Sequence, residues 1–160
     1  MRLAKKSGKI RSVTYSEALE SALCFGWIDG QKKSYDEGSW LQRFTPRGPK
    51  SIWSKINRAS ALRLIEDGRM KPSGLAAVEK AKASGSWNEA YDSHRNASPP
   101  RDFQSALNKT PRAKAFFATL NSQNRYAILF RIQTARKPAT RQKRIDHFVK
   151  MLAGHKMLYP

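Results

Sequence analysis

Apolar positions near the start of the chain follow helical spacing. They recur on one helix face between residues 18 and 23, and Gly26 marks the end of the predicted helix. Thr14 is followed three residues later by Glu17, which is the spacing of a capping box. The pattern therefore predicts a helix that begins after Thr14 and ends at Gly26.

Beyond this helix the pattern changes to that of a β-hairpin. Residues 26–35 are predicted to be extended, residues 36–38 to form a turn, and residues 39–45 to form the returning strand. Pro46 ends that strand, because proline has no N–H to offer the ladder. The N-terminal part is therefore expected to hold a hairpin or a small antiparallel sheet.

The turn also predicts which side chains meet across the hairpin. If Tyr35 pairs with Ser39, Asp29 lies opposite Thr45 on one face of the ladder. This register places three further side chains on that face around the carboxylate: Trp27, Arg43 and Arg47.

Two interpretations of this cluster remain open. It is either a structural salt bridge that sets the hairpin register, or a site for an anion, a small ligand or an enzymatic reaction. The candidate residues of the second interpretation are Trp27, Asp29, Arg43, Arg47 and Trp53. A register slip of one residue would remove both, because it moves every side chain to the other face.

Helical patterns account for most of the remaining chain. Ser51 or Ser54 is expected to cap a helix that ends at Gly68, and Ser73 to cap one that ends at Gly85. After a polar segment that closes with two prolines, four more helices are predicted. The first spans residues 102–108, and the second opens at Thr110-Pro111. The third starts at Ser122, and the fourth is capped by Thr140.

The predicted fold class is therefore α+β and mostly helical. A helix-plus-hairpin lobe is expected at residues 1–98, and a basic helical lobe at residues 99–160. The two lobes are also compatible with one compact domain. A bundle of about four helices is expected in the C-terminal lobe.

Several stretches together resemble the bacterial bacteriocin-protection, YdeI/OmpD-associated family. They include Thr14–Leu19, Ala22–Gly30, Arg43–Arg47 and Ser51–Asn57, and the resemblance continues to Met151–Gly154. It implies an association with bacteriocin or stress tolerance and with a porin. It supplies no catalytic residues.

Similar proteins have a further segment before the position where this chain begins. Residues 1–6 are then expected to lie in the middle of an element, and apolar surface near residues 1–30 to be covered by a rearranged strand or by self-association. A homo-oligomer is therefore one expectation.

Charge is distributed unevenly along the chain. The sequence carries 31 lysines and arginines against 12 acids, a net charge of +19, and residues 101–160 hold 13 of the bases and only two acids. Seven cations occur with no acid among them: Arg125, Arg131, Arg136, Lys137, Arg141, Lys143 and Arg144. They predict contact with a polyanion, either the phosphates of nucleic acid or an acidic protein, or else form a solvated charged face.

Other chemistries find little support. The single cysteine, Cys24, excludes an intramolecular disulfide and a multi-cysteine zinc site, and the three histidines are widely spaced. No nucleophile motif or glycine-rich phosphate loop occurs. A non-enzymatic binding protein without metal or cofactor is favoured over an enzyme. No apolar run is long enough for a membrane span or a signal peptide, so a cytoplasmic location is expected.

Overall fold

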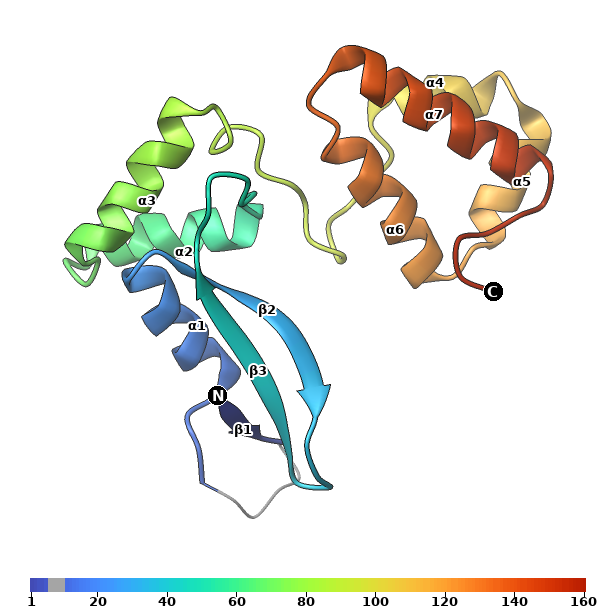
Figure 1. The fold of residues 1–160 in the computed structure, drawn as a ribbon. Coiled ribbons are helices and arrows are strands. Elements are labelled where there is room, and N and C mark those ends of the chain that lie inside the picture. Colours follow the sequence, from blue (N-terminus) through green and yellow to red (C-terminus); the bar gives the residue numbers. More distant parts are fainter. Residues whose placement is uncertain (6–10) are drawn as a thin grey trace. The chain divides into compact units, whose positions relative to one another are not determined.

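The computed structural model describes residues 1–5 and 11–160 and divides them into two compact units, Met1–Ala90 and Tyr91–Pro160 (Figure 1). The N-terminal unit holds a three-stranded antiparallel sheet and three helices. The C-terminal unit holds four helices. The predicted α+β, mostly helical fold class is confirmed.

The sheet consists of β1 (Arg2–Ala4), β2 (Trp27–Ser34) and β3 (Ser39–Pro46), in the order β1-β3-β2. The hairpin of β2 and β3 is the predicted one. Strand β1 adds to its other edge, and Leu3 of this strand is fully buried. Of residues 1–6, which the sequence places inside an element, Lys6 lies outside the described residues.

The hairpin register changes along its length. Near the turn it is the predicted register, with Lys32 opposite Gln42. Further from the turn it slips by one residue, and Asp29 pairs with Phe44. The prediction that Asp29 lies opposite Thr45 is therefore wrong. The cause is an irregularity between Asp29 and Lys32, where β2 has one residue more than β3.

The side chain of Gln42 forms a hydrogen bond with the backbone of β2 at this bulge. Gln42 is only 3% exposed, and its Nε2 donates to the carbonyl oxygen of Gly30 at 3.0 Å. A buried side-chain amide such as that of Gln42 needs such a partner. The bulge in β2 is thus stabilised by Gln42 of the facing strand β3.

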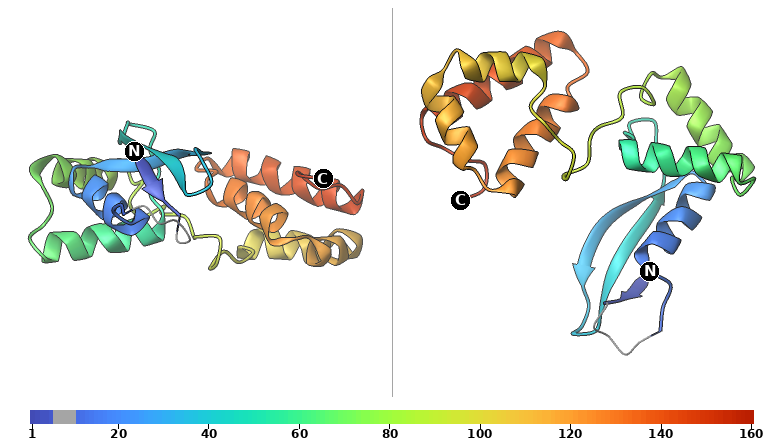
Figure 2. Two further views of the ribbon diagram at one scale, coloured as in Figure 1. Left: turned by 90° about the horizontal axis from the view of Figure 1, so that it is seen from below. Right: turned by 180° about the vertical axis from the view of Figure 1, so that it is seen from behind.

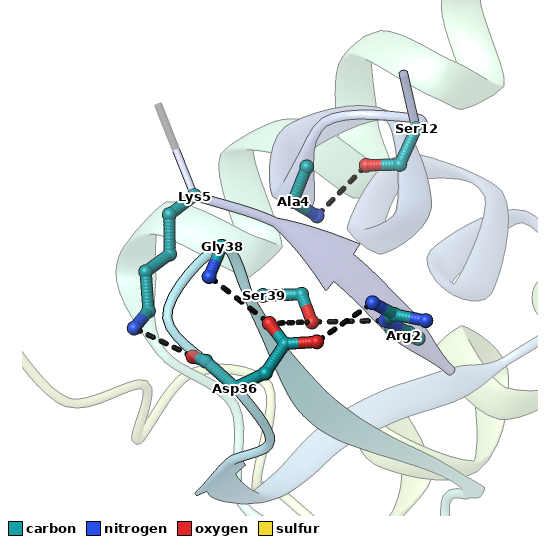
Figure 3. A network of polar contacts seen from close by, with 7 residues as sticks. All are labelled: Arg2, Ala4, Lys5, Ser12, Asp36, Gly38 and Ser39. Carbon is teal, nitrogen blue, oxygen red and sulfur yellow. Dashed lines mark hydrogen bonds and ion pairs between the residues drawn. The ribbon is translucent and has the colours of Figure 1, made fainter. Parts of the chain in front are cut away.

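The hairpin turn is organised by Asp36 and tied to β1 (Figure 3). Its carboxylate accepts hydrogen bonds from Gly38 N at 3.0 Å and Ser39 Oγ at 2.7 Å, and Arg2 Nη2 lies 2.7 Å away. Lys5 Nζ donates to the carbonyl oxygen of Asp36 at 3.0 Å. The hydrogen bond from Ser39, followed by the charge of Arg2, lowers the pKa of Asp36 below its ordinary value.

Helix α1 (Tyr15–Cys24) begins with the predicted capping box. Glu17 N donates to Thr14 Oγ1 at 3.2 Å, and the Glu17 carboxylate accepts from Thr14 N at 2.7 Å. Helix α2 (Lys55–Glu66) is capped by the side chain of Ser54. Both starts agree with the sequence, because in each case a hydroxyl accepts from an otherwise unsatisfied N–H.

Helix α3 (Pro72–Ala83) begins one residue before its predicted cap, Ser73. Lys71 occupies the N-cap position without a side-chain cap bond. Helix α3 packs closely on α1, because Gly74 has no side chain. A Cβ on Gly74 would lie 2.2 Å from the carbonyl oxygen of Cys24.

The core of the N-terminal unit lies among α1, α2, α3 and the segment that follows. Trp53 and Trp87 meet edge to face at its centre, with ring centroids 4.9 Å apart. The buried residues of this core are Leu23, Cys24, Trp53, Ala61, Leu64, Met70, Val78, Ala81, Trp87 and Ala90.

The C-terminal unit is built from α4 (Arg101–Asn108), α5 (Pro111–Thr119), α6 (Ser122–Gln133) and α7 (Pro138–Ala153). Helix α7 lies alongside α4 and α5 and also packs on α6 (Figures 1 and 2). The buried residues of its core are Phe103, Leu107, Ala113, Phe117, Leu120, Ile128, Leu129, Ile132, Ile145, Phe148 and Leu152.

Helix α7 starts earlier than the sequence predicts. Its first residue is Pro138 and its N-cap is Lys137, whereas Thr140 was the predicted cap. Among the described residues, no helix combines the length and apolar character that crossing a bilayer requires.

Candidate functional site

Two of the predicted cations lie where α7 begins and hold the C-terminal unit together. Arg141 donates to both carboxylate oxygens of Asp102, at 2.6 and 3.0 Å, and to the carbonyl oxygen of Ile132 at 2.8 Å. Arg144 donates to the carbonyl oxygen of Arg131. These bonds link α7 to α4 and satisfy carbonyls at the C-terminal end of α6, where cations are favoured.

Two further cations lie on α6 itself. Arg131 donates to the carbonyl oxygen of Ala127 at 3.0 Å and to the hydroxyl of Tyr159 at 3.3 Å. Arg125 donates to the carbonyl oxygen of Ala118 at 2.8 Å. These acceptors are neutral oxygens, so the bonds orient the guanidiniums without neutralising their charge.

Arg136, Lys137 and Lys143 are exposed around the start of α7. Lys150 follows Lys143 by seven residues and therefore shares its face of the helix. Lys150 was not among the predicted residues, although its seven-residue spacing from Lys143 is visible in the sequence. We call this set of eight cations the basic face: Arg125, Arg131, Arg136, Lys137, Arg141, Lys143, Arg144 and Lys150.

Few acids offset the charge of this unit. Residues 91–160 contain 14 lysines and arginines, and their acids are Asp92, Asp102 and Asp146. Asp102 is engaged by Arg141, whose hydrogen bond lowers the pKa of the carboxyl below its ordinary value. The Asp102–Arg141 pair therefore stays charged well into the acid range, and the net charge of residues 91–160 is strongly positive at neutral pH.

The structure does not bring together the five hairpin candidates. Asp29 and Trp27 share a sheet face with Phe44, because of the register beyond the bulge, and Asp29 accepts a hydrogen bond from the Tyr15 hydroxyl at 2.8 Å. Arg43 occupies the opposite face of the strand. The predicted cluster of Asp29 with two guanidiniums is thus dispersed by the one-residue slip.

Arg47 and Trp53 do meet, but away from Asp29. The Arg47 guanidinium lies 3.5 Å from the centroid of the Trp53 ring, and its Nη1 donates to the carbonyl oxygen of Ile52 at 3.1 Å. The pocket beside them has a volume of about 30 Å³. That is about the volume share of one water molecule, so the pocket is too small for an organic anion.

Trp27 instead borders an apolar groove between α1 and the sheet. The groove has a volume of about 410 Å³, and Trp27 is 41% exposed there. Its apolar lining residues are Met1, Val13, Ala18, Ala22, Phe25, Trp27 and Phe44. The groove was not predicted from the sequence. The bulge decides that Trp27 and Phe44 share one face of the sheet, and the bulge itself was not predicted. Among the described residues, no three His, Cys, Asp or Glu side chains gather closely enough to hold a metal ion.

Two family models match different parts of the chain. Residues 96–155 match the family described as Bacteriocin-protection, YdeI or OmpD-Associated, and residues 1–77 match a Domain of unknown function (DUF8412). No curated protein and no solved structure matches the chain. The family predicted from the sequence is confirmed as a domain match over residues 96–155, which lie in the C-terminal unit. The motifs Gly26–Asp29 and Arg43–Arg47 lie in the segment that the other model matches.

Proposed function

We propose that the C-terminal unit, which contains the match to the YdeI/OmpD-associated family, is a non-enzymatic module that binds a polyanion. The polyanion that suits it best is nucleic acid, contacted at its phosphates by the basic face. The observation that carries the proposal is the excess of 14 lysines and arginines over three acids in residues 91–160. Each phosphate that a cation neutralises releases counterions, which favours binding.

The arginines of the basic face add a second argument. Arg131 and Arg144 are held by hydrogen bonds to neutral backbone or phenol oxygens. A guanidinium whose position is already fixed loses less conformational entropy when it meets a phosphate. The lysines supply mobile point charges around them. Phosphate contacts of this kind carry no base specificity.

An acidic protein is the alternative partner of the same surface, and a solvated charged face is the alternative without a partner. A small-molecule or enzymatic site around Asp29, Arg43 and Arg47 finds less support, because the strand register separates Arg43 from Asp29. We also propose a cytoplasmic location and a contribution to bacteriocin or stress tolerance. The words bacteriocin-protection in the family description motivate the bacteriocin part of this role.

Titration of a labelled DNA duplex with matched charge variants tests the binding. One variant replaces Lys137, Lys143 and Lys150 of the basic face by Gln. The control variant makes the same charge change in the N-terminal unit, at three exposed lysines: Lys33, Lys50 and Lys71. All six lysines are exposed, so both proteins are expected to fold normally.

The proposal predicts that the basic-face variant binds the duplex at least about tenfold more weakly in roughly 0.1 M salt, and equally so for unrelated sequences. The control variant should bind within about twofold of the unaltered chain, because only delocalised charge changes. Equal losses in the two variants would show that net charge alone, and no particular face, attracts the duplex. Absence of duplex binding together with binding of an acidic polypeptide would favour the alternative partner.

A further inference from the structure

The C-terminal unit contains a cavity that shares only Arg125 with the basic face. It has a volume of about 300 Å³, which is at the lower end of the range for small-molecule sites. The residues that line it come from the segment before α4, from the α5–α6 connection and from α6. They are His94, Ala97, Leu120, Ser122, Arg125, Tyr126 and Leu129.

Part of the cavity lining is apolar and aromatic. Leu120 and Leu129 are 6% and 1% exposed and belong to the core, so they cannot turn away. The rings of His94 and Tyr126 meet with centroids 5.0 Å apart. The Tyr126 hydroxyl donates to the carbonyl oxygen of Asp92 at 3.3 Å, and burial raises the pKa of this phenol above its ordinary value. The phenol therefore stays protonated and its ring is fixed.

The remaining lining residues include polar and positive groups. The Arg125 guanidinium is anchored by Nη2 to the carbonyl oxygen of Ala118 at 2.8 Å and lies 5.6 Å from the centroid of the Phe117 ring. A guanidinium has five N–H donors, so this bond leaves several for a ligand. Ser122 also lines the cavity. Among the described residues that line the cavity, none is an acid.

We propose that this cavity binds a small planar aromatic anion, with its ring on the apolar lining and its charged head at Arg125 and Ser122. The apolar lining favours an aromatic ring, and the guanidinium of Arg125 favours a negatively charged head. A neutral aromatic ligand would bury the guanidinium face without a charge partner, which is unfavourable. A bare phosphate would leave the apolar lining against water and gain nothing from it. A carboxylate and a phosphate head both fit this chemistry, because a guanidinium can hold either in a bidentate pair.

This site goes beyond the proposed polyanion binding and shares only Arg125 with the basic face. The experiment is calorimetric titration of the full chain with four probes: phenyl phosphate, benzoate, inorganic phosphate and benzyl alcohol. The first two carry both halves of the ligand and differ in the charged head. Each of the last two lacks one half.

The expected result is submillimolar to millimolar binding of phenyl phosphate or benzoate. Inorganic phosphate and benzyl alcohol should both bind at least about tenfold more weakly, a difference of about 1.4 kcal/mol. Arg125→Gln should weaken the aromatic anion at least tenfold. Arg112→Gln, which removes an exposed cation of α5 outside the cavity, should leave its affinity unchanged.

A second variant protects the test against misfolding of the first. Ala97→Phe fills the cavity without changing the charge, so it should also abolish binding of the aromatic anion, while duplex binding by the basic face is kept. Equal affinity for benzyl alcohol and the aromatic anions, or equal effects of Arg125→Gln and Arg112→Gln, would overturn the proposal. Failure of the unaltered chain to bind either aromatic anion at about 1 mM would do the same.

Discussion

At the scale of single residues, a close approach of α3 to α1 depends on Gly74. A Cβ there would lie 2.2 Å from the carbonyl oxygen of Cys24 and 2.4 Å from Sδ of Met70. Gly74→Ala should destabilise the unit by about 1–3 kcal/mol, because the backbone oxygen cannot give way. This clash should outweigh the roughly 1 kcal/mol by which alanine favours a helix over glycine. Urea unfolding measures the change.

Gly48→Ala is the matched control. Nothing lies within 4 Å of the position a Cβ would take on Gly48. Its effect on the free energy of unfolding should stay within about 0.5 kcal/mol. If Gly74→Ala were as mild as Gly48→Ala, the close packing of α3 on α1 would be contradicted.

The register of the β2–β3 hairpin could be predicted from the sequence only in part. Alternation and turn residues were enough to predict the β2–β3 hairpin and its register near the turn. They could not predict the bulge beyond Lys32, because a bulge is fixed by tertiary partners such as the buried amide of Gln42. One extra residue in β2 then moved Asp29 to the face of Phe44, and the predicted Asp29–Arg43 cluster was lost with it.

At the scale of elements, the capping box of α1 makes a clear prediction. Thr14→Ala should reduce the stability of the N-terminal unit by about 1 kcal/mol, because it removes the acceptor of the Glu17 N–H. Thr110 is the matched control. It occupies the N-cap of α5 but its side chain makes no cap hydrogen bond. Thermal unfolding should show a lower midpoint for Thr14→Ala and little change for Thr110→Ala, whereas equal shifts would contradict the difference between the two caps.

Helix starts were predicted correctly where a side chain caps the helix, as at Thr14, and where proline was expected at the first helical position, as at Thr110-Pro111. Thr14 was identified from its spacing, and Ser54 was one of two predicted caps, the other being Ser51; both Thr14 and Ser54 accept a hydrogen bond from the helix. Ser73 and Thr140 were the predicted caps of two further helices, and each lies one or two residues after a proline. The structure places Pro72 and Pro138 inside the first turns of α3 and α7. Proline fits there because the first N–H of a helix has no intrahelical partner to lose.

The Asp102–Arg141 pair predicts an acid dependence at the element scale. The pKa of Asp102 is lowered in the folded state, so its contribution is present above the unfolded pKa, about 3.9, and is lost as pH falls through the folded pKa. The Asp102 side chain is 44% exposed, so the loss should not exceed about 1 kcal/mol.

The comparison of the unaltered chain with Asp102→Asn isolates this contribution, because the other acids titrate in both proteins. The stability advantage of the unaltered chain at neutral pH should shrink below about pH 4. A difference that stays constant between neutral pH and about pH 3 would contradict the role assigned to the pair.

At the scale of the whole molecule, the distribution of charge along the chain could be predicted from the sequence. The contacts that the charged side chains make could not. Counting residues reveals the excess of cations toward the C-terminus. It cannot reveal that Arg141 and Arg144 turn back onto carbonyls of α6, or that Arg131 meets Tyr159, because those contacts join residues of different elements. Substituting Arg141 would therefore mix loss of folding with loss of binding. The exposed lysines are the better probes of function.

The salt dependence of duplex binding tests the polyanion proposal most directly. On duplex DNA, log K should fall linearly with log [salt] with a slope of about −0.9 for each phosphate neutralised. If at least four cations of the basic face contact phosphates, the slope for the unaltered chain should be steeper than about −3.5 between roughly 50 and 200 mM salt. Replacement of Lys137, Lys143 and Lys150 by Gln should reduce its magnitude by up to about three. A slope near zero, or no binding tighter than about 10⁻⁴ M at low salt, would contradict the assignment of the basic face to nucleic-acid phosphates.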